Sequence, residues 1–335
     1  MYKTPFHSAD ISKNSFLVTG GAGFIGSNIV EYLLKYNAGK VVVLDNLSTG
    51  FEENIKEYLK LPNFKFINGD ICNLNDCTKA CENIDYVFHL AALGSVPRSI
   101  KNPIATNDVN INGFLNVLVA ARDVKVKRIV YSSSSSVYGD STALPKIEEH
   151  IGNALSPYAV SKRTNELYGN VFAQTYGMEI IGLRYFNIFG PRQNPKGEYA
   201  AAIPLFMDAL LKNQSPFING DGEQSRDFTF VENAVQANVK AMFATSKNAT
   251  GQIYNIAVGE KISVNGLFNI LKELSGASVN ATHRDNRPGD IRDSLADISK
   301  AKKLLNYEPR VKINEGLQIT INWFSKHFGY QPISK

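Results

Sequence analysis

The chain alternates between short apolar runs and segments whose apolar residues recur every three or four positions. The runs have the length of buried strands, and they lie at 15–19, 41–45, 64–67, 85–92, 128–131 and 253–257. Helical spacing follows the first run and recurs at 107–122, 264–274 and 314–328. Strands that alternate with helices are typical of a parallel sheet covered by helices on both faces. We therefore predict an α/β fold with a Rossmann-like, doubly wound parallel sheet.

The first predicted strand leads directly into a glycine-rich turn. Residues 20–26 read Gly-Gly-Ala-Gly-Phe-Ile-Gly, and Ile29 and Leu33 continue an apolar helical face behind them. Such a turn lets the backbone approach a pyrophosphate and directs the amides of a helix N-terminus at it. Alone, the turn is weak evidence, because a strand, turn and helix of this kind can also bind nothing.

The second predicted strand supplies the context for that turn. It ends in Asp45, about 20 residues after the turn, where the ribose hydroxyls of a dinucleotide would lie. A carboxylate there repels a 2′-phosphate, and no arginine follows in residues 46–50. The pattern favours NAD over NADP. Asp70 follows the next strand, and we expect it to meet the adenine amino group.

Tyr158 and Lys162 form a candidate acid-base pair at a predicted helix start. Ser156 suits the N-cap and Pro157 the first helical position, so the phenol and the ammonium would share one helix face. Keeping a phenol ionised at neutral pH requires about 4 kcal/mol. An ammonium about 5 Å away supplies roughly 3 kcal/mol of that at an effective dielectric of ~20. Chance also produces this spacing, so neighbouring motifs must decide its meaning.

Five consecutive serines, 132–136, follow the strand 128–131. In isolation they would suggest a flexible loop. At the carboxyl end of a parallel strand, where such sheets bind ligands, their hydroxyls can instead contact a sugar oxygen and pass a proton to a phenolate. The histidine in the preceding strand, His89, is better explained as a core residue than as a ligand.

Composition excludes several other classes of function. The chain has 335 residues, a net charge of +5 and scattered basic residues, which argues against a nucleic-acid partner. Three cysteines (72, 77 and 81) lack the spacing of a disulfide framework or a zinc site, so we expect buried thiols in a reducing cytoplasm and no metal. The sequence has neither a signal-peptide core nor a run of about 18 apolar residues, so we expect no membrane contact.

Together these motifs resemble the extended short-chain dehydrogenase/reductase family. The resemblance rests on the glycine turn, Asp45, Asp70, the serine run and the Tyr158–Lys162 pair. Downstream, the Leu-Arg-Tyr-Phe-Asn of 183–187 and the Arg-Asp-Phe of 226–228 are similar to its nucleotide-sugar branch, and within that branch to the UDP-N-acetylglucosamine 4-epimerases. The resemblance covers nearly the whole chain, from about residue 14 to 307.

The resemblance implies two domains. An NAD-binding domain would span 14–186, with returning segments near 228–258, and a nucleotide-sugar domain would span 187–227 and 259–330. The residues implied for NAD binding are Gly20, Gly23, Phe24, Ile25, Gly26, Asp45, Asn46, Ser48, Thr49, Gly50, Asp70, Ile71, Leu90, Ala91, Ala92, Asn110, Ser132, Tyr158, Lys162 and Tyr185. Those implied for the UDP-sugar are Ser134, Ser135, Ser136, Asn187, Tyr199, Ala201, Arg226, Arg287, Asp290 and Ser294.

In the reaction that the resemblance implies, Tyr158 is the base, Lys162 lowers its pKa and holds the nicotinamide ribose, and Ser134 bridges to the sugar. The sugar would be oxidised at C4 to a 4-keto sugar, with transient NADH. Reduction from the other face of the sugar would then invert the configuration at C4. Dehydratases of the branch have Asp and Glu where this chain has Ser135 and Ser136, so elimination is disfavoured. Ser294 takes a position where a small residue leaves room for a 2-acetamido group.

We therefore expect reversible interconversion of UDP-GlcNAc and UDP-GalNAc, possible also for UDP-Glc and UDP-Gal. Two alternatives remain open: another NAD-dependent nucleotide-sugar enzyme, such as a uronate epimerase, decarboxylase or 4,6-dehydratase, and a dinucleotide sensor without catalysis. Relatives of this family commonly form homodimers through helices equivalent to 107–122 and 157–176. The nucleotide base and the direction of the reaction in the cell are left open by the sequence.

Overall fold

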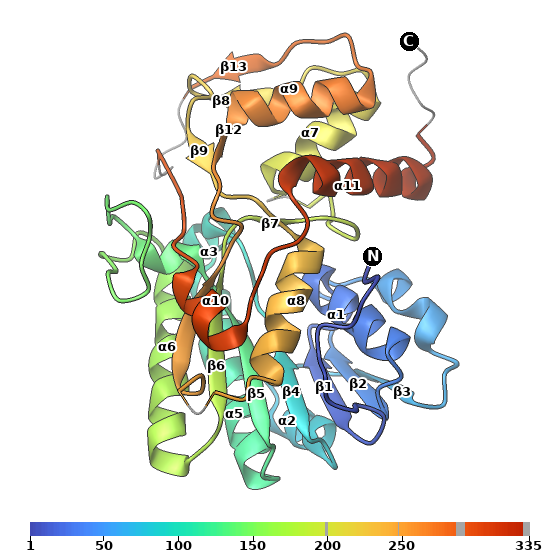
Figure 1. The fold of residues 1–335 in the computed structure, drawn as a ribbon, viewed down its shortest axis with the longest axis vertical. Coiled ribbons are helices and arrows are strands. Elements are labelled where there is room, and N and C mark those ends of the chain that lie inside the picture. The colour runs from blue at the N-terminus through green and yellow to red at the C-terminus, as the bar shows by residue number, and fades with distance from the viewer. Residues whose placement is uncertain (198–199, 247, 286–291, 331–335) are drawn as a thin grey trace.

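The computed structural model describes residues 1–197, 200–246, 248–285 and 292–330. At its centre is a seven-stranded sheet in the order β11-β6-β5-β4-β1-β2-β3, with every neighbouring pair parallel (Figure 1). The strands are β1 (Ser15–Thr19), β2 (Lys40–Asp45), β3 (Phe64–Asn68), β4 (Tyr86–His89), β5 (Arg128–Ser134), β6 (Ile180–Tyr185) and β11 (Gln252–Ile256). This confirms the predicted Rossmann-like fold. The winding direction reverses between β1 and β4, which is where such sheets bind ligands.

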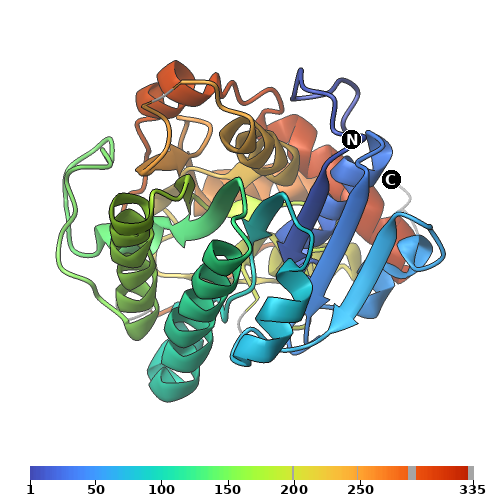
Figure 2. The ribbon, with the colours of Figure 1, turned by 90° about the horizontal axis from the view of Figure 1, so that it is seen from below.

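Helices cover both faces of the sheet, each over its own apolar core (Figure 2). One face carries α1 (Phe24–Lys35) and α8 (Val231–Met242); the other carries α2 (Leu74–Cys81), α5 (Gly113–Asp123) and α6 (Pro157–Tyr176). Successive strand residues point to opposite faces. In β1, accordingly, Phe16 and Val18 lie in the first core and Leu17 in the second.

A third core lies beyond the carboxyl ends of the large sheet, at the top of Figure 1. Its helices are α7 (Ala202–Leu211), α9 (Val264–Ser275) and α11 (Ile313–Phe328). Short strands pair as β7 (Ile188–Phe189) with β10 (Thr229–Phe230), β8 (Phe217–Asn219) with β13 (Thr282–Arg284), and β9 (Ser225–Arg226) with β12 (Ile262–Ser263). By contrast, α10 (Ser299–Leu305) packs on the large sheet, because Ala301 and Leu305 belong to its core.

Several local features differ from the sequence-based expectations. The helix predicted at 107–122 starts earlier, with α3 (Val96–Lys101) and α4 (Pro103–Asn107), and passes through a π-helical turn (Asp108–Asn112) into α5. Short 3₁₀ segments occupy Glu52–Asn54, Lys56–Tyr58 and Ser135–Tyr138. The strand predicted at 85–92 already ends at His89. Its continuation leaves the sheet because the side chain of Asn110 accepts the amide of Leu93 at 2.8 Å and donates to its carbonyl at 3.1 Å.

The first residues of the chain are part of the core, which their polar composition did not predict. Tyr2 and Phe6 are buried, and both rings pack against Tyr32 of α1. Of the three cysteines expected to be buried, Cys77 and Cys81 are, whereas Cys72 is exposed, because it lies in the loop before α2. Within the residues described, no helix combines the length and the apolar character needed to cross a bilayer.

Candidate active site

A cavity of about 740 Å³ opens at the carboxyl ends of β1, β2, β4, β5 and β6. Most of the residues predicted to bind the cofactor or the sugar line it. They are Gly20, Gly23, Phe24, Ile25, Gly26, Asp45, Asn46, Ser48, Thr49, Asp70, Ile71, Leu90, Ala91, Ala92, Ser132, Ser134, Tyr158, Lys162, Tyr185, Asn187 and Ala201. The fold thus brings together in one place segments that are up to 181 residues apart along the chain, as Gly20 and Ala201 are.

Six predicted site residues lie outside the lining of this cavity: Gly50, Asn110, Ser135, Ser136, Arg226 and Ser294. Asn110 supports the loop after β4 from behind, and Ser136 donates to the hydroxyl of Ser134 at 2.9 Å. Arg226 and the buried Ser294 lie together beside Ser225, whose carbonyl accepts from both at 2.8 and 3.0 Å. Tyr199, Arg287 and Asp290 fall outside the described residues.

The glycine turn fits a dinucleotide because side chains are excluded from it. A Cβ on Gly26 would lie 2.1 Å from the carbonyl oxygen of Gly20, and Gly20 itself has a left-handed φ of +69°. Helix α1 begins directly after the turn and no side chain caps it, so its first amides are available for a pyrophosphate. The turn therefore has the close backbone approach that a pyrophosphate requires.

Asp45 is held in place at the far edge of the turn. Its carboxylate accepts the amides of Ala22 at 3.0 Å and Leu47 at 2.8 Å, and burial raises its pKa despite these bonds. The carboxylate of Asp70 lies close by, where it accepts from Asn46 at 2.9 Å. These two are the only acidic residues among the described residues that line the cavity. They suit the hydroxyls and amino group of an adenosine.

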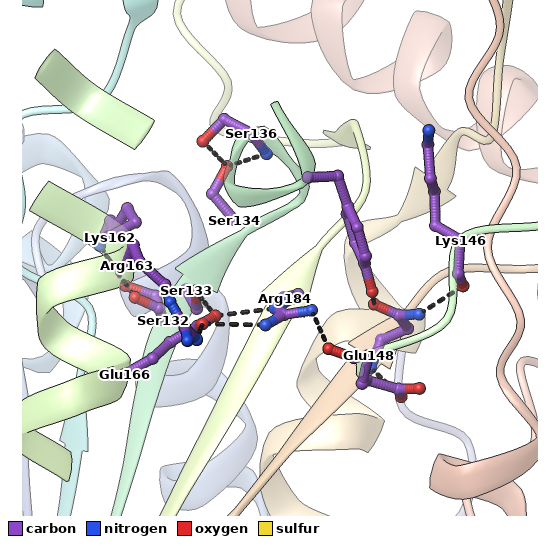
Figure 3. Close-up of polar contacts among 12 residues, drawn as sticks. Ser132, Ser133, Ser134, Ser136, Lys146, Glu148, Lys162, Arg163, Glu166 and Arg184 are labelled. Carbon is purple, nitrogen blue, oxygen red and sulfur yellow. Dashed lines mark hydrogen bonds and ion pairs between the residues drawn. The ribbon is translucent and has the colours of Figure 1, made fainter. Parts of the chain in front are cut away.

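Tyr158 and Lys162 lie where the sequence predicted, in the first turns of α6. Ser156 caps the helix by accepting the amide of Ala159 at 3.1 Å, which aims the helix start at the cavity. The ammonium of Lys162 donates to the carbonyl of Ser132 at 2.8 Å and to its hydroxyl at 3.3 Å. Figure 3 shows Lys162 reaching from the helix to the end of β5.

In the polypeptide alone, the pKa of Tyr158 lies above its ordinary value. Burial raises this pKa, and the hydrogen bond to Ser134 opposes the rise. The ammonium of Lys162 is held at Ser132, by its bonds to the carbonyl and the hydroxyl of that residue. Burial lowers the pKa of Lys162 itself to about 8, with the Glu166 carboxylate acting against it. A positive group bound beside Tyr158 would lower this pKa towards neutrality.

A histidine near the site, His89, lies in the core. His89 is buried, and its Nδ1 lies 2.8 Å from the hydroxyl of Thr19, so it is a core residue as predicted. Burial lowers the pKa of His89 to about 3, which keeps the ring neutral. Among the residues that the structure describes, no cluster of histidine, cysteine or acidic side chains could hold a metal ion.

Comparison with known proteins identifies the family. Residues 16–257, well over half of the chain, match the NAD dependent epimerase/dehydratase family. The chain belongs to this family. It is therefore an NAD-dependent enzyme of the extended short-chain dehydrogenase/reductase type, and NAD is its cofactor.

Relatives within this epimerase family cover almost the entire chain. A putative UDP-glucose 4-epimerase from Methanocaldococcus jannaschii is 40% identical over 93% of this chain and 98% of its own length. The solved UDP-N-acetylglucosamine 4-epimerase from Methanobrevibacter ruminantium is 40% identical with a TM-score of 0.88, covering 94% of this chain and 99% of its own. The UDP-glucuronic acid 4-epimerase from Bacillus cereus, solved with UDP-glucuronic acid and NAD, is 33% identical with a TM-score of 0.86. It covers 93% of this chain and 99% of its own. The relatives named here are epimerases of UDP-sugars, and each aligns with more than nine-tenths of this chain.

Sequence reasoning missed part of this epimerase cavity. Gly94, Ser95 and Arg98 line it from the loop and short helix after β4, and Gln193 lines it from the loop after β7. Among the residues that the structure describes, the buried Oε1 of Gln193 meets no hydrogen-bond partner. The Ser-Val-Pro of 95–97 was a helix-start signal directly after a predicted strand, and it could have revealed the first group. Gln193 had no comparable signal.

Proposed function

We propose that this chain catalyses the reversible C4 epimerisation of UDP-N-acetylhexosamines, interconverting UDP-GlcNAc and UDP-GalNAc, with UDP-Glc and UDP-Gal as further substrates. The observation on which this rests is the meeting of Tyr158, Lys162 and Ser134 at the carboxyl edge of the sheet, in the cavity that fits NAD. A phenol, an ammonium and a hydroxyl are the groups that alcohol oxidation requires.

In the proposed reaction, Tyr158 removes the proton of the sugar 4-hydroxyl, directly or through the hydroxyl of Ser134. Lys162 keeps a positive charge beside the phenolate as the 4-keto sugar forms. When bound, NAD would supply a two-electron acceptor for the hydride of C4, and its positive ring would add to the charge beside Tyr158. After the keto sugar rotates in the cavity, Tyr158 returns the proton to the sugar oxygen and the configuration at C4 is inverted.

Among the described residues, those that line the proposed sugar end include no acidic group, which supports epimerisation over elimination. Expelling a hydroxyl requires a proton donor next to the base, and Ser135 and Ser136 stand where dehydratases of the branch have acids. Among the described lining residues, only Asp45 and Asp70 are acidic, and both belong to the proposed adenosine end. A site with these groups suits simple oxidation and reduction at one carbon.

Two features support an N-acetylated sugar. Ser294 is small and buried, and we propose that it leaves space for the acetamido group. The unpartnered oxygen of Gln193 offers an acceptor for an acetamido N–H, which would remove the cost of burying it unpaired. We further propose that Asn187, Tyr199, Ala201, Arg226, Arg287 and Asp290 contact the UDP moiety, since arginines match a diphosphate and a carboxylate matches ribose hydroxyls.

The same proposal includes a homodimer in the cytoplasm. Val160, Leu167 and Val171 lie on α6 seven and four residues apart, and each is about half exposed. Ile100 and Ile104, on the neighbouring α3 and α4, are exposed still further, at 64% and 74%. An apolar stripe of this kind on the helices named for dimerisation supports pairing through α6. The predicted division into an NAD-binding and a nucleotide-sugar domain is retained as a proposal, with α10 assigned to the former.

The test is a product assay without added cofactor. Purified protein is incubated separately with UDP-GlcNAc, UDP-GalNAc, UDP-Glc and UDP-glucuronate, and the anomeric proton signals are followed by NMR. We expect both N-acetylated sugars to reach one common equilibrium mixture. Release of CO₂, a 6-deoxy-4-keto product or conversion of the uronate alone would replace the proposal with one of the other family activities.

A further inference from the structure

Three residues on one face of α6 meet three consecutive serines of β5. Tyr158, Lys162 and Glu166 are spaced by four residues, so they stack along the helix. The contacts pair Tyr158 with Ser134, Lys162 with Ser132, and Glu166 with Ser133, whose hydroxyl donates to Oε1 at 2.7 Å. The proposed reaction uses the first two pairs. It leaves the third unexplained, because Glu166 does not line the cavity.

Glu166 is the centre of a buried charged cluster (Figure 3). Its carboxylate accepts from Nε and Nη2 of Arg184 at 2.7 and 2.9 Å, and both side chains are 1% exposed. Arg163 adds a third bond, at 3.0 Å. Arg184 also donates to the carbonyl of Glu148 at 2.9 Å. Apolar residues in place of a buried ion pair often give equal stability. The buried pair of Glu166 and Arg184, one turn beyond Lys162, therefore points to a role other than stabilising the fold.

We propose that Glu166 is a positioning residue of the reaction, which keeps Lys162 in its charged form and holds the catalytic face of α6 against the serines of β5. This inference rests on the proposed function, because it assumes that Tyr158 and Lys162 are the proton-transfer pair. Glu166 would act through Lys162 without touching the sugar or NAD.

The charges around Lys162 support this role. Burial lowers the pKa of Lys162 to about 8, and the carboxylate of Glu166 is the charged group that opposes it. From its own helix Lys162 also faces Tyr158, and from β4 it faces His89, which is neutral. Glu166 in turn faces Arg163, Arg184 and, from β5, the buried Tyr131. Without Glu166, Lys162 would lose its proton at a lower pH.

Two variants separate this role from plain stabilisation. Glu166→Gln removes the negative charge but leaves Arg184 buried without its carboxylate, which lowers stability. Glu166→Gln combined with Arg184→Met removes that unpaired charge as well. We expect the double variant to regain thermal stability. In both variants the fall of kcat at alkaline pH should begin about one pH unit lower than in wild type, because a nearby opposite charge shifts a pKa by at least about one unit. KM for the UDP-sugar should change little.

Glu179→Gln is the matched control. Its carboxylate pairs with Arg128 at 2.6 Å and so also joins β5 to the start of β6, but at the opposite end of these strands. We expect this variant to keep the wild-type alkaline limb. Glu166→Asp, which retains the charge, should keep the limb as well and lose only part of kcat.

A second readout does not depend on turnover. The ¹³Cε signal of Lys162, assigned by its loss in Lys162→Met, should titrate at lower pH in the Glu166→Gln variants than in wild type. The inference would be overturned if Lys162 titrated at the same pH in the variants as in wild type, or if the double variant kept the wild-type alkaline limb of the kcat–pH profile. If the single variant does not fold, the double variant and Glu166→Asp decide. A wild-type protein inactive on every UDP-sugar would refute the proposed function, while the Lys162 titration would still test Glu166.

Discussion

The two ends of the active-site cavity are built in different ways. The proposed NAD end is local: the glycine turn, Asp45 and Asp70 follow directly after three adjacent strands, and backbone amides hold the carboxylates. The proposed sugar end is assembled from distant parts, including Ser134, Tyr158 and Gln193. Arg226 and Ser294, which are also proposed for it, lie beside Ser225 outside the cavity lining. The first end should therefore decide whether any reaction occurs, and the second which sugar reacts.

Breaking the NAD end should have the largest effect. In Gly26→Ala the new Cβ would lie 2.1 Å from the carbonyl of Gly20, so the turn must shift away from the pyrophosphate. A displacement of about 1 Å can reduce activity roughly 100-fold, and we expect such a loss with every UDP-sugar. Retained NAD, measured in the supernatant after heat denaturation, should fall in parallel.

Gly177→Ala, in the C-cap of α6, controls for the loss of stability that follows from substituting a glycine, because a Cβ there meets no atom within 4 Å but the left-handed φ of +65° disfavours a side chain. It should keep both NAD and activity. If Gly26→Ala lost activity with one UDP-sugar and kept it with another, the NAD end would also determine which sugar reacts, and the contrast between the two ends would be wrong.

A change at the sugar end should alter preference instead. Ser294→Tyr fills the proposed acetamido space, so kcat/KM for UDP-GlcNAc relative to UDP-Glc should drop by roughly 100-fold, as expected when a pocket becomes too small. NAD content should remain at the wild-type level. Ser294→Ala, which keeps the space open, should behave like wild type. Equal losses for both sugars would remove Ser294 from the account of specificity.

The pH dependence should report on the junction between the two ends. Burial depresses the pKa of Lys162 from its ordinary 10.5 to about 8. Because the ammonium is the active form, kcat should fall about tenfold per pH unit above that value. Because the pKa of Lys162 is lower in the folded chain, the unfolded chain binds more protons than the folded chain between pH 8 and 10.5. The contribution of Lys162 to the free energy of unfolding therefore increases as pH rises through that window. In Lys162→Arg, whose charge persists, the alkaline limb should disappear although kcat is lower.

The smallest effect is expected at Gln193. Gln193→Leu removes the unpartnered oxygen and keeps the size of the side chain, so KM for UDP-GlcNAc should rise by about fivefold to tenfold, the worth of one hydrogen bond. KM for UDP-Glc, which has no acetamido group, serves as the internal control and should stay constant. A rise for both sugars would mean that Gln193 contacts the shared part of the substrate.

The same contrast explains what the sequence could predict. The glycine turn, Asp45 and the Ser156 cap of α6 were predictable because each depends on residues close to it in the chain. Gln193 was not, since its position depends on the loop after β7 folding over strands from the other half of the chain. The pKa of Tyr158 in the presence of NAD stays a prediction, because in the polypeptide alone burial raises this pKa and the spacing did not show that Lys162 would donate to Ser132. The role proposed for Glu166 required the pairing of α6 with β5, which only the structure supplies.

The central claim is that the hydroxyl of Tyr158 removes and returns the proton of the sugar 4-hydroxyl. The most direct measurement is the epimerisation rate of Tyr158→Phe with UDP-GlcNAc, followed by NMR and normalised to NAD content and thermal stability. The account predicts a rate lower by on the order of 10³-fold, the contribution of a positioned acid-base group, with NAD content near that of wild type. A rate close to that of wild type would contradict it.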